Sequence, residues 1–251
     1  MSDDKQPDLA RREFLQGSAG AAAGLAVAPG VMLYGPAASA KPIDEAASSE
    51  VRWGMLIDAN KCASDCDACV RACNTEHGLG DEDQSGPRQQ TQYIRKVELR
   101  NKATGASHSL PMMCQHCETP PCADVCPTGA SFKRADGIVL VDRHICIGCR
   151  YCMMACPYKA RSFVHESLED QEPYTPRGKG CVESCTLCVH RIDLGGIPAC
   201  AEACGAEGNG AILFGDLNDP NSAIAQAVAE QATTEVRADL GLNVGVRYQG
   251  I

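Results

Sequence analysis

The hydrophobic pattern begins with one long, weakly apolar run, which is followed by short apolar runs between polar and cysteine-rich stretches. Two of the short runs, VRWGMLID at residues 51–58 and AILFG at 211–215, predict β-strands. Residues 131–133 and 138–141 predict two more strands, joined at Asp136-Gly137, a dipeptide that favours hairpin turns. Short strands mixed with short helical segments indicate an α+β fold.

Polar segments rich in Gly and Pro interrupt this pattern. Residues 81–90 and 171–180 predict loops, which serve either as solvated connections or as contacts with a partner. Near the end, Asp219-Pro220 predicts the start of a helix, with Asp219 as N-cap and Pro220 in the first turn. We expect this C-terminal helix to pack on the outside of the fold.

The long run covers residues 14–40 and has the layout of an export signal. Arg11 and Arg12 precede it, it carries no charge, and it ends in ASA at residues 38–40, a cleavage pattern. This layout is typical of a twin-arginine signal, so we expect residues 1–40 to direct export of the folded chain to the periplasm and then to be removed. A retained membrane anchor is the alternative.

Composition narrows the classes of partner. Residues 1–40 carry three basic and four acidic side chains, so the remainder has 20 against 28 and a formal charge of −8. An acidic surface disfavours phosphate backbones, which excludes nucleic acid as a partner. No second apolar run is long enough to span a membrane. Aromatic residues make up 4% of the chain, so we expect something other than large side chains to fill part of the interior.

Of the 17 cysteines, 16 fall into four groups of four, and in every group the last two are four residues apart. The groups are Cys62, Cys66, Cys69 and Cys73; Cys114, Cys117, Cys122 and Cys126; Cys146, Cys149, Cys152 and Cys156; and Cys185, Cys188, Cys200 and Cys204. The third group, CIGCRYCMMACP, has the C-x2-C-x2-C-x3-C-P spacing of bacterial [4Fe-4S] ferredoxins. The sequence therefore predicts four [4Fe-4S] clusters.

The spacing also predicts which thiols share a cluster. A tight loop supplies three thiolates to one cluster, whereas the fourth cysteine lies one helical turn further on and reaches a neighbouring cluster. This rule pairs the second group with the third, and the first with the fourth. The predicted ligand sets are Cys62, Cys66, Cys69 and Cys204; Cys185, Cys188, Cys200 and Cys73; Cys114, Cys117, Cys122 and Cys156; and Cys146, Cys149, Cys152 and Cys126.

The order of the groups along the chain predicts the domain organisation. The first and fourth groups flank the other two, so they meet only if the central pair is inserted between them. We expect a contiguous two-cluster lobe over residues 111–157, inserted into a discontinuous lobe made of 41–110 and 158–251. Asn74 and Gly205 of the discontinuous lobe stand where the ferredoxin run has proline, so this lobe departs from the run.

Three other interpretations use closely spaced cysteines. A zinc module is disfavoured because zinc ribbons join two separated pairs, and a disulfide module because the number of cysteines is odd. Residues 62–69 also have the C-x3-C-x2-C spacing of radical S-adenosylmethionine enzymes, but here every cluster has a fourth thiolate and no open iron. Cys181 is left over; we interpret it as a buried spare thiol, with replacement of Cys185 as a ligand the alternative.

The other polar residues near the groups have simpler interpretations. We expect His116 and His190 to be hydrogen-bonding or surface residues rather than ligands. GAEGNG at residues 205–210 lacks the order of a dinucleotide-binding loop and predicts a turn. Four cationic side chains are expected to be solvated, with electrostatic tuning of a cluster as the alternative: Lys133, Arg134, Arg161 and Arg191.

Clusters ligated only by thiolates leave no vacant iron for a substrate, so their natural role is to accept and release single electrons. Two lobes with two clusters each would form a relay between redox partners, and not a catalyst alone. Because the clusters also fill much of the interior, we expect folding to depend on them.

The four groups occur together with HCETPPCADVCPTGA at residues 116–130, CRYCMMACPYKAR at 149–161 and FGDLNDP at 214–220. With these stretches the chain resembles the four-cluster ferredoxin-like electron-transfer subunits of the dimethyl sulfoxide reductase family, over about residues 50–250. The resemblance implies a fold of two ferredoxin-like halves.

Two further stretches, residues 62–80 and 180–196, are similar to the periplasmic iron–sulfur subunit of a membrane complex of dissimilatory sulfur metabolism. That likeness implies a polytopic quinone-interacting membrane subunit as neighbour, a multihaem cytochrome c nearby, and attachment to the membrane through partners. The alternatives within the family are the iron–sulfur subunit of an exported molybdopterin reductase for tetrathionate or thiosulfate, or of a nitrite-reducing quinol system.

Overall fold

The computed structural model describes residues 45–80, 90–102, 104–169 and 171–251. The predicted export signal at residues 1–40 and all but the last residue of the predicted loop at 81–90 lie outside these ranges. Within them, no helix combines the length and the hydrophobicity that crossing a membrane requires. The predicted loop at 171–180 is irregular, as expected.

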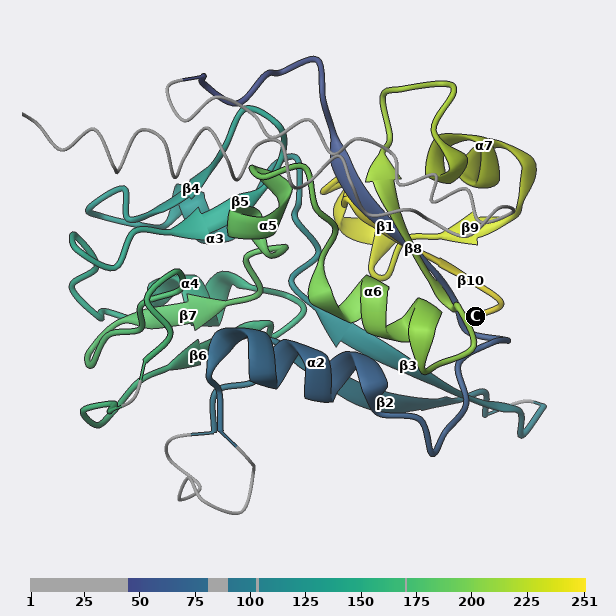
Figure 1. Ribbon diagram of the computed structural model, residues 1–251, viewed down its shortest axis with the longest axis horizontal. Coiled ribbons are helices and arrows are strands. Elements are labelled where there is room, and N and C mark those ends of the chain that lie inside the picture. The colour runs from purple at the N-terminus through teal and green to yellow at the C-terminus, as the bar shows by residue number, and fades with distance from the viewer. Residues whose placement is uncertain (1–44, 81–89, 103, 170) are drawn as a thin grey trace, which may run out of the picture. The chain divides into compact units, whose positions relative to one another are not determined.

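The largest sheet has four strands in the order β8-β1-β10-β9 (Figure 1). β1 (Trp53–Asp58) pairs antiparallel with β8 (Ile212–Asp216) on one side and parallel with β10 (Val246–Gln249) on the other. β9 (Thr233–Thr234) forms the edge beside β10. The two strands predicted from the short apolar runs are therefore confirmed and are direct neighbours, and β10, which was not predicted, completes the sheet.

The C-terminal helix packs on this sheet, but it begins later than predicted. α7 (Ala223–Glu230) contacts β8 and β1, and the side chain of its own residue Ile224 is fully buried. Ser222 is the N-cap, and its hydroxyl accepts a hydrogen bond from the Ala225 N–H. The predicted N-cap at Asp219 is wrong, because its carboxylate instead accepts the Asn221 N–H in a tight turn before the helix.

Three two-stranded antiparallel sheets complete the β structure. They are β2 (Ile94–Arg100) with β3 (Ser107–Met113), β4 (Ser131–Lys133) with β5 (Val139–Val141), and β6 (Arg161–Phe163) with β7 (Val182–Ser184). The β4–β5 hairpin confirms the strands predicted on either side of Asp136-Gly137. Gly137 has φ 86°, a conformation that side chains disfavour, and the Asp136 carboxylate accepts the Ile138 N–H.

Short helices bring the cysteine groups together in pairs. α2 (Ala68–His77) and α6 (Ala199–Ala206) lie side by side, so the first and fourth cysteine groups meet although more than 100 residues separate them (Figure 1). α3 (Pro121–Asp124) packs against α4 (Tyr151–Ala155) in the same way, which joins the second and third groups. The other helices of the described residues, besides α7, are α5 (Val189–Ile192) and the 3-10 helix Ala238–Leu240.

Cysteine side chains form a large part of the interior. Twelve of the 17 cysteines are buried, and most of these belong to one continuous apolar cluster with side chains of the sheets, such as Met55, Ile57, Leu110 and Tyr248. Few aromatic residues contribute to this cluster. The interior is therefore built around thiols, as the low aromatic content led us to expect.

Truncation of a core side chain tests this description. Ile57 is fully buried on the central strand β1, whereas Leu99 on β2 is 41% exposed. We expect Ile57→Ala to destabilise the protein by roughly 2–5 kcal/mol, because it leaves a cavity, and Leu99→Ala by less than about 0.5 kcal/mol. Guanidinium unfolding followed by far-UV circular dichroism measures both. Equal midpoints for the two variants would contradict the assignment of the core.

Candidate iron–sulfur centres

Four cysteines from two chain segments line a cavity between α2 and α6. The cavity is partly open to solvent and is also lined by Pro111 and Ile212. Burial raises the pKa of Cys69 to about 11, and the charges of Cys204 and Cys62 raise it further. We call this set the first quartet: Cys62, Cys66, Cys69 and Cys204.

A second set surrounds Cys73, one helical turn beyond Cys69 on α2. Burial raises the pKa of the Cys73 thiol far above its ordinary value, and the nearby charges of Cys185, Cys200 and Cys188 act in the same direction. These three thiols come from the loop before α5 and from α6. The second quartet is Cys73, Cys185, Cys188 and Cys200.

The third set lies where the loop before α3 meets the end of α4. Its cavity is lined by all four thiols together with Pro121, Val139 and Tyr158. Burial raises the pKa of both Cys114 and Cys117 to about 12. The third quartet is Cys114, Cys117, Cys122 and Cys156.

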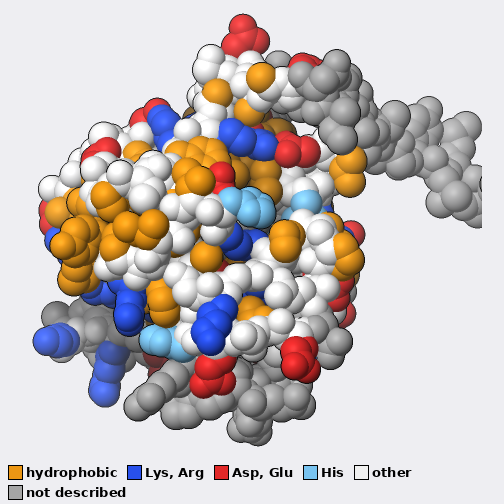
Figure 2. Space-filling view, turned by 90° about the vertical axis from the view of Figure 1, so that its left-hand side faces the viewer, with side chains coloured by type: hydrophobic (Ala, Val, Ile, Leu, Met, Phe, Trp, Pro, Cys, Tyr) orange, Lys and Arg blue, Asp and Glu red, His pale blue; other side chains and the backbone are white. Residues whose placement is uncertain are grey.

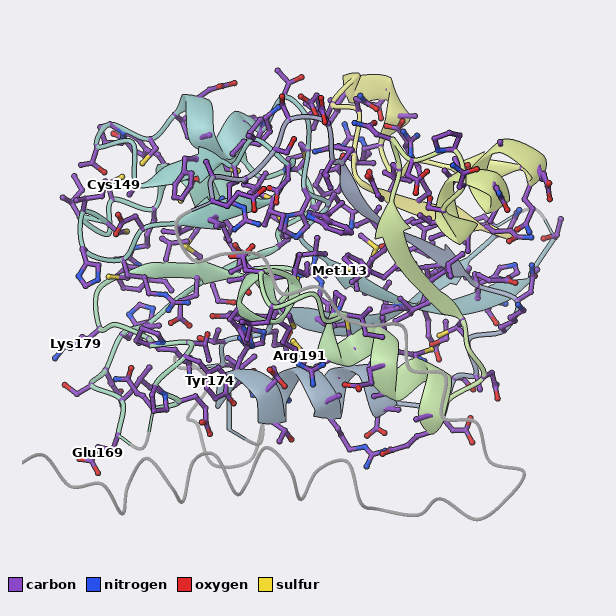
Figure 3. The ribbon with its side chains drawn as sticks, turned by 45° about the horizontal axis from the view of Figure 1, so that its top comes forward. Met113, Cys149, Glu169, Tyr174, Lys179 and Arg191 are labelled. Atoms are coloured by element: carbon purple, nitrogen blue, oxygen red, sulfur yellow. The ribbon has the colours of Figure 1, made fainter. Side chains whose placement is uncertain are left out.

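The fourth set is the most exposed. Its cavity is lined by thiols from the loop after α3, from the loop before α4 and from α4 itself. Cys149 is exposed and lies at the periphery of the molecule, whereas Met113 lies deep inside (Figure 3). The fourth quartet is Cys126, Cys146, Cys149 and Cys152.

The backbone of the C-x2-C loops curls in one recurrent way. The residue before the second cysteine has a positive φ in three loops: 45° at His116, 68° at Gly148 and 56° at Leu187. Residues other than glycine rarely adopt this conformation, and its recurrence beside cysteines points to a functional constraint. At Gly148 a Cβ would also lie 2.3 Å from the Gly180 carbonyl oxygen, so glycine is required there.

Each quartet receives hydrogen bonds at sulfur. Backbone N–H groups donate to Cys204 at 3.2 Å, to Cys185 at 3.4 Å and to Cys126 at 3.4 Å. The third quartet receives one from the side chain of Arg161, which donates to Cys122 at 3.0 Å. Hydrogen bonds to sulfur favour the thiolate and help to set the redox potential of iron–sulfur centres.

Unpaired polar groups beside the cavities fit a further acceptor inside them. Among the buried side-chain donors that lack a hydrogen-bond partner within the part of the chain that the structure describes, three line these cavities: Ser131 Oγ, Tyr158 Oη and Arg161 Nη1. Ser131 lines the cavity of the fourth quartet, and the other two line that of the third. Buried donors are almost always satisfied, so the sulfides of a cluster would complete their hydrogen bonding.

The geometry does not suit a single ion. Within the described ranges, no three His, Cys, Asp or Glu side chains come close enough together to hold one metal ion. All 17 cysteines are free thiols. Three cavities are each bounded by four thiols, and four thiolates are the ligands that a [4Fe-4S] cluster takes.

The charge of buried thiolates explains why the group that fits the quartets contains metal. Thiols whose pKa is raised to about 11 or 12 by burial stay protonated near neutral pH. Thiolates, not thiols, bind metals, and iron ions supply the positive charge that stabilises buried thiolates. The donor sets therefore fit iron–sulfur clusters.

Comparison with known proteins agrees with this chemistry. Residues 106–216 match the model of the 4Fe-4S dicluster domain family. The chain is 39% identical to iron–sulfur subunit 1 of the Hdr-like menaquinol oxidoreductase of Archaeoglobus fulgidus, with 96% of this chain and 97% of that protein covered. The chain belongs to the family of 4Fe-4S dicluster iron–sulfur subunits.

Two other relatives show the range of this family. One component of the tetrathionate reductase of Salmonella typhimurium is 34% identical, with 97% of this chain and 89% of that protein covered. The protein NrfC of Escherichia coli is 35% identical, with 76% of this chain and 77% of its own length covered. This family member thus binds [4Fe-4S] clusters and is an electron-transfer subunit of a larger oxidoreductase.

The two histidines beside the cysteine groups behave as expected. His116 is buried, and its Nδ1 accepts a hydrogen bond from the Val139 N–H at 3.0 Å. His190 Nε2 lies 2.7 Å from the Glu76 carboxylate. Both are therefore hydrogen-bonding residues.

The expectation that all four cationic side chains are solvated is wrong for Arg161. It is 6% exposed and contacts Cys122, because it begins β6 with its side chain directed inward. Lys133 pairs with Glu118, Arg134 bridges Asp136 and Asp193, and Arg191 pairs with Glu76 and Glu202; these three are partly exposed.

Two residues that lie beside the quartets were not predicted from the sequence. Lys96 on β2 donates to Cys62 Sγ at 3.3 Å and to two backbone carbonyls, and no local pattern marks it. His77 Nε2 lies 3.5 Å from Cys188 Sγ. Because His77 follows Cys73 by four residues on α2, the i, i+4 relation was a usable signal. Burial lowers the pKa of His77 to about 3, so the ring is neutral.

Cys181 lies outside the four quartets but close to one of them. It is buried, and its thiol lies 3.3 Å from the Arg143 carbonyl oxygen and hydrogen-bonds Cys146. Burial raises its pKa, and the charge of Cys146 adds to this effect.

This neighbouring pair of cysteines provides a matched test of ligation. We expect Cys181→Ala to keep the iron and acid-labile sulfide of the parent protein, about sixteen irons per chain at four per cluster. We expect Cys146→Ala to lose about four irons, the content of one cluster. Both are measured on protein purified without oxygen, with zinc assayed in the same samples. If Cys181→Ala lost iron and Cys146→Ala did not, Cys181 would be the ligand in place of Cys146.

Proposed function

We propose that this chain carries four [4Fe-4S] clusters, one in each quartet, and relays single electrons through them between a quinone-interacting membrane subunit and other redox subunits of a sulfur-metabolism complex. The subunit of this kind that the sequence resembles is DsrO of the DsrMKJOP complex. The observation that carries the proposal is the arrangement of the quartets. At least one thiol of each quartet lies near a thiol of the next quartet in the order first to fourth.

The contacts between quartets support a linear order. Cys69 of the first quartet influences the pKa of Cys200 in the second, although burial is the larger cause. In the same way, Cys114 of the third quartet acts on Cys185 of the second. The third and fourth quartets meet where Cys122 lies near Cys152. The proposed path therefore runs from the first quartet to the fourth without a gap.

The residues of the chain have simple roles in this proposal. The thiols hold the clusters, which when bound accept and release one electron each. The side chains around the second and third quartets exclude water, because their thiols are at least nine-tenths buried. Every cluster has four protein thiolates, so the chain offers no open iron for a substrate.

The fourth quartet is the proposed exit toward the membrane partner. Figure 2 looks onto the end of the molecule that carries α4 and the β4–β5 hairpin, where hydrophobic side chains gather. Beside the exposed Cys149, Ile147 is 67% exposed, Met154 66% and Tyr151 55%. Exposed apolar patches of this kind mark interaction sites, so we propose that the polytopic quinone-interacting subunit covers this surface.

Similarity to a component of a menaquinol oxidoreductase supports a quinone-linked partner. We further propose a periplasmic location, reached in the folded state through the twin-arginine signal at residues 1–40, with attachment to the membrane through partner subunits. A multihaem cytochrome c is the proposed redox neighbour. These assignments rest on the family resemblance and on the sequence pattern.

We also propose the two-lobe organisation for this chain. The inserted lobe spans residues 111–157 and carries the third and fourth clusters, whereas residues 41–110 and 158–251 carry the first and second. The packing of α3 on α4 and of α2 on α6 supports this division. β6–β7 of the discontinuous lobe lies against β5 and α4, so the two lobes share an extended contact.

The second candidate is an iron–sulfur subunit of an exported molybdopterin reductase, such as one for tetrathionate, or of a nitrite-reducing quinol system. Similarity over nearly the whole chain to a component of a tetrathionate reductase favours it. A zinc or disulfide interaction module is a candidate of another class. It is disfavoured by the spacing of the thiols and by their free state.

The metal and haem content of the native assembly separates the two leading candidates. We expect the complex purified from its membrane to contain haem c and the iron of four clusters per copy of this chain, with molybdenum far below stoichiometry. The measurements are metal analysis and the pyridine haemochrome spectrum. Stoichiometric molybdenum without haem c would contradict the assignment to a sulfur-metabolism complex and support the molybdopterin reductase.

A further inference from the structure

Arg161 lies between two of the quartets. Its Nη2 donates to Cys122 Sγ of the third quartet at 3.0 Å. Its guanidinium also lies close enough to Cys152 of the fourth quartet for the two groups to act on each other's pKa. One buried cation therefore contacts a ligand sulfur of the third quartet and lies near one of the fourth.

The surroundings of Arg161 leave its charge directed at these centres. Burial disfavours the charged guanidinium, but the thiol groups of Cys122, Cys114 and Cys152 outweigh this and raise its pKa. Within the described ranges no carboxylate forms an ion pair with Arg161, unlike Arg134 or Arg191. Its Nη1 is buried and has no hydrogen-bond partner among the described atoms.

We propose that Arg161 is a tuning residue that raises the reduction potentials of the third and fourth clusters together. This inference rests on the proposed function, because it requires clusters in both quartets. Reduction adds negative charge to a cluster, and a buried cation beside its ligands stabilises that charge. A shared guanidinium therefore makes both final centres of the relay easier to reduce.

The guanidinium suits this position better than an ammonium. Its planar fork holds several N–H donors at fixed angles and addresses two acceptors at once, whereas Lys presents a compact point charge. Lys96 illustrates the difference, since its Nζ contacts a single thiol, Cys62, and otherwise binds backbone carbonyls. Its influence is confined to the first quartet.

The experiment is an EPR-monitored redox titration of the cluster-loaded full chain. In Arg161→Gln we expect two of the four midpoint potentials to fall and two to stay. Hydrogen bonds from charged donors to thiolates are strong, so the reduction equilibrium of each affected cluster should fall at least about tenfold, which is about 59 mV for one electron. In Arg161→Lys the charge remains but the fork is lost, so we expect a smaller fall.

Two control variants make the result specific to position. Lys96→Met removes a cation next to Cys62, and we expect it to lower one midpoint that Arg161→Gln leaves in place. Arg237→Gln removes an exposed cation that pairs with Asp239 and makes no hydrogen bond to a cysteine within the described residues. All four midpoints should stay at their parent values in that variant.

Iron and sulfide are assayed before each titration, which separates the inference from the function beneath it. A parent chain without four clusters would refute the proposed function itself. Parent-like midpoints in an iron-replete Arg161→Gln, or an equal shift of all four, would refute the tuning role alone. Should Arg161→Gln assemble incompletely, Arg161→Lys decides, and loss of clusters from both would reduce Arg161 to a structural residue.

Discussion

The bond between cysteine thiolate and iron is the interaction on which the rest of this structure depends. In the proposed ligation it joins residues 62–69 to Cys204 in the first quartet, and Cys73 to residues 185–200 in the second. Such bonds would link segments that are more than 100 residues apart. They would also keep side chains such as Cys69 and Cys73 as thiolates, although burial raises the pKa of both thiols. The low aromatic content is consistent with this design, because the clusters occupy space that large side chains fill in other proteins.

The same constraint explains the secondary structure. Four thiols must converge on each cavity, so the helices that carry them are short and the C-x2-C loops adopt left-handed backbone at His116, Gly148 and Leu187. The four-stranded sheet carries none of the quartet thiols, but Met55 and Ile57 of its central strand pack in the same apolar cluster as the buried cysteines. The sheet and the quartets therefore share one interior.

The sequence predicted those features that depend on local spacing or composition. The β4–β5 hairpin, strands β1 and β8, and the burial of thiols in the interior all follow from short patterns. Strand β10 was missed because GVRYQG has a weak alternating pattern and gains its place from pairing with β1. Arg161 was misjudged because its burial results from its position beside Cys122 and Cys152, which arises only when the chain folds, and no local pattern announces it.

The central claim is that four iron–sulfur clusters lie in the four quartets, in the order first to fourth. Anomalous diffraction at the iron absorption edge, from crystals grown without oxygen, tests it most directly. The account predicts four separate iron peaks, each surrounded by the sulfur atoms of one quartet and none beside Cys181. Single-atom peaks between pairs of cysteines, or electron density for disulfide bonds in place of iron, would contradict it.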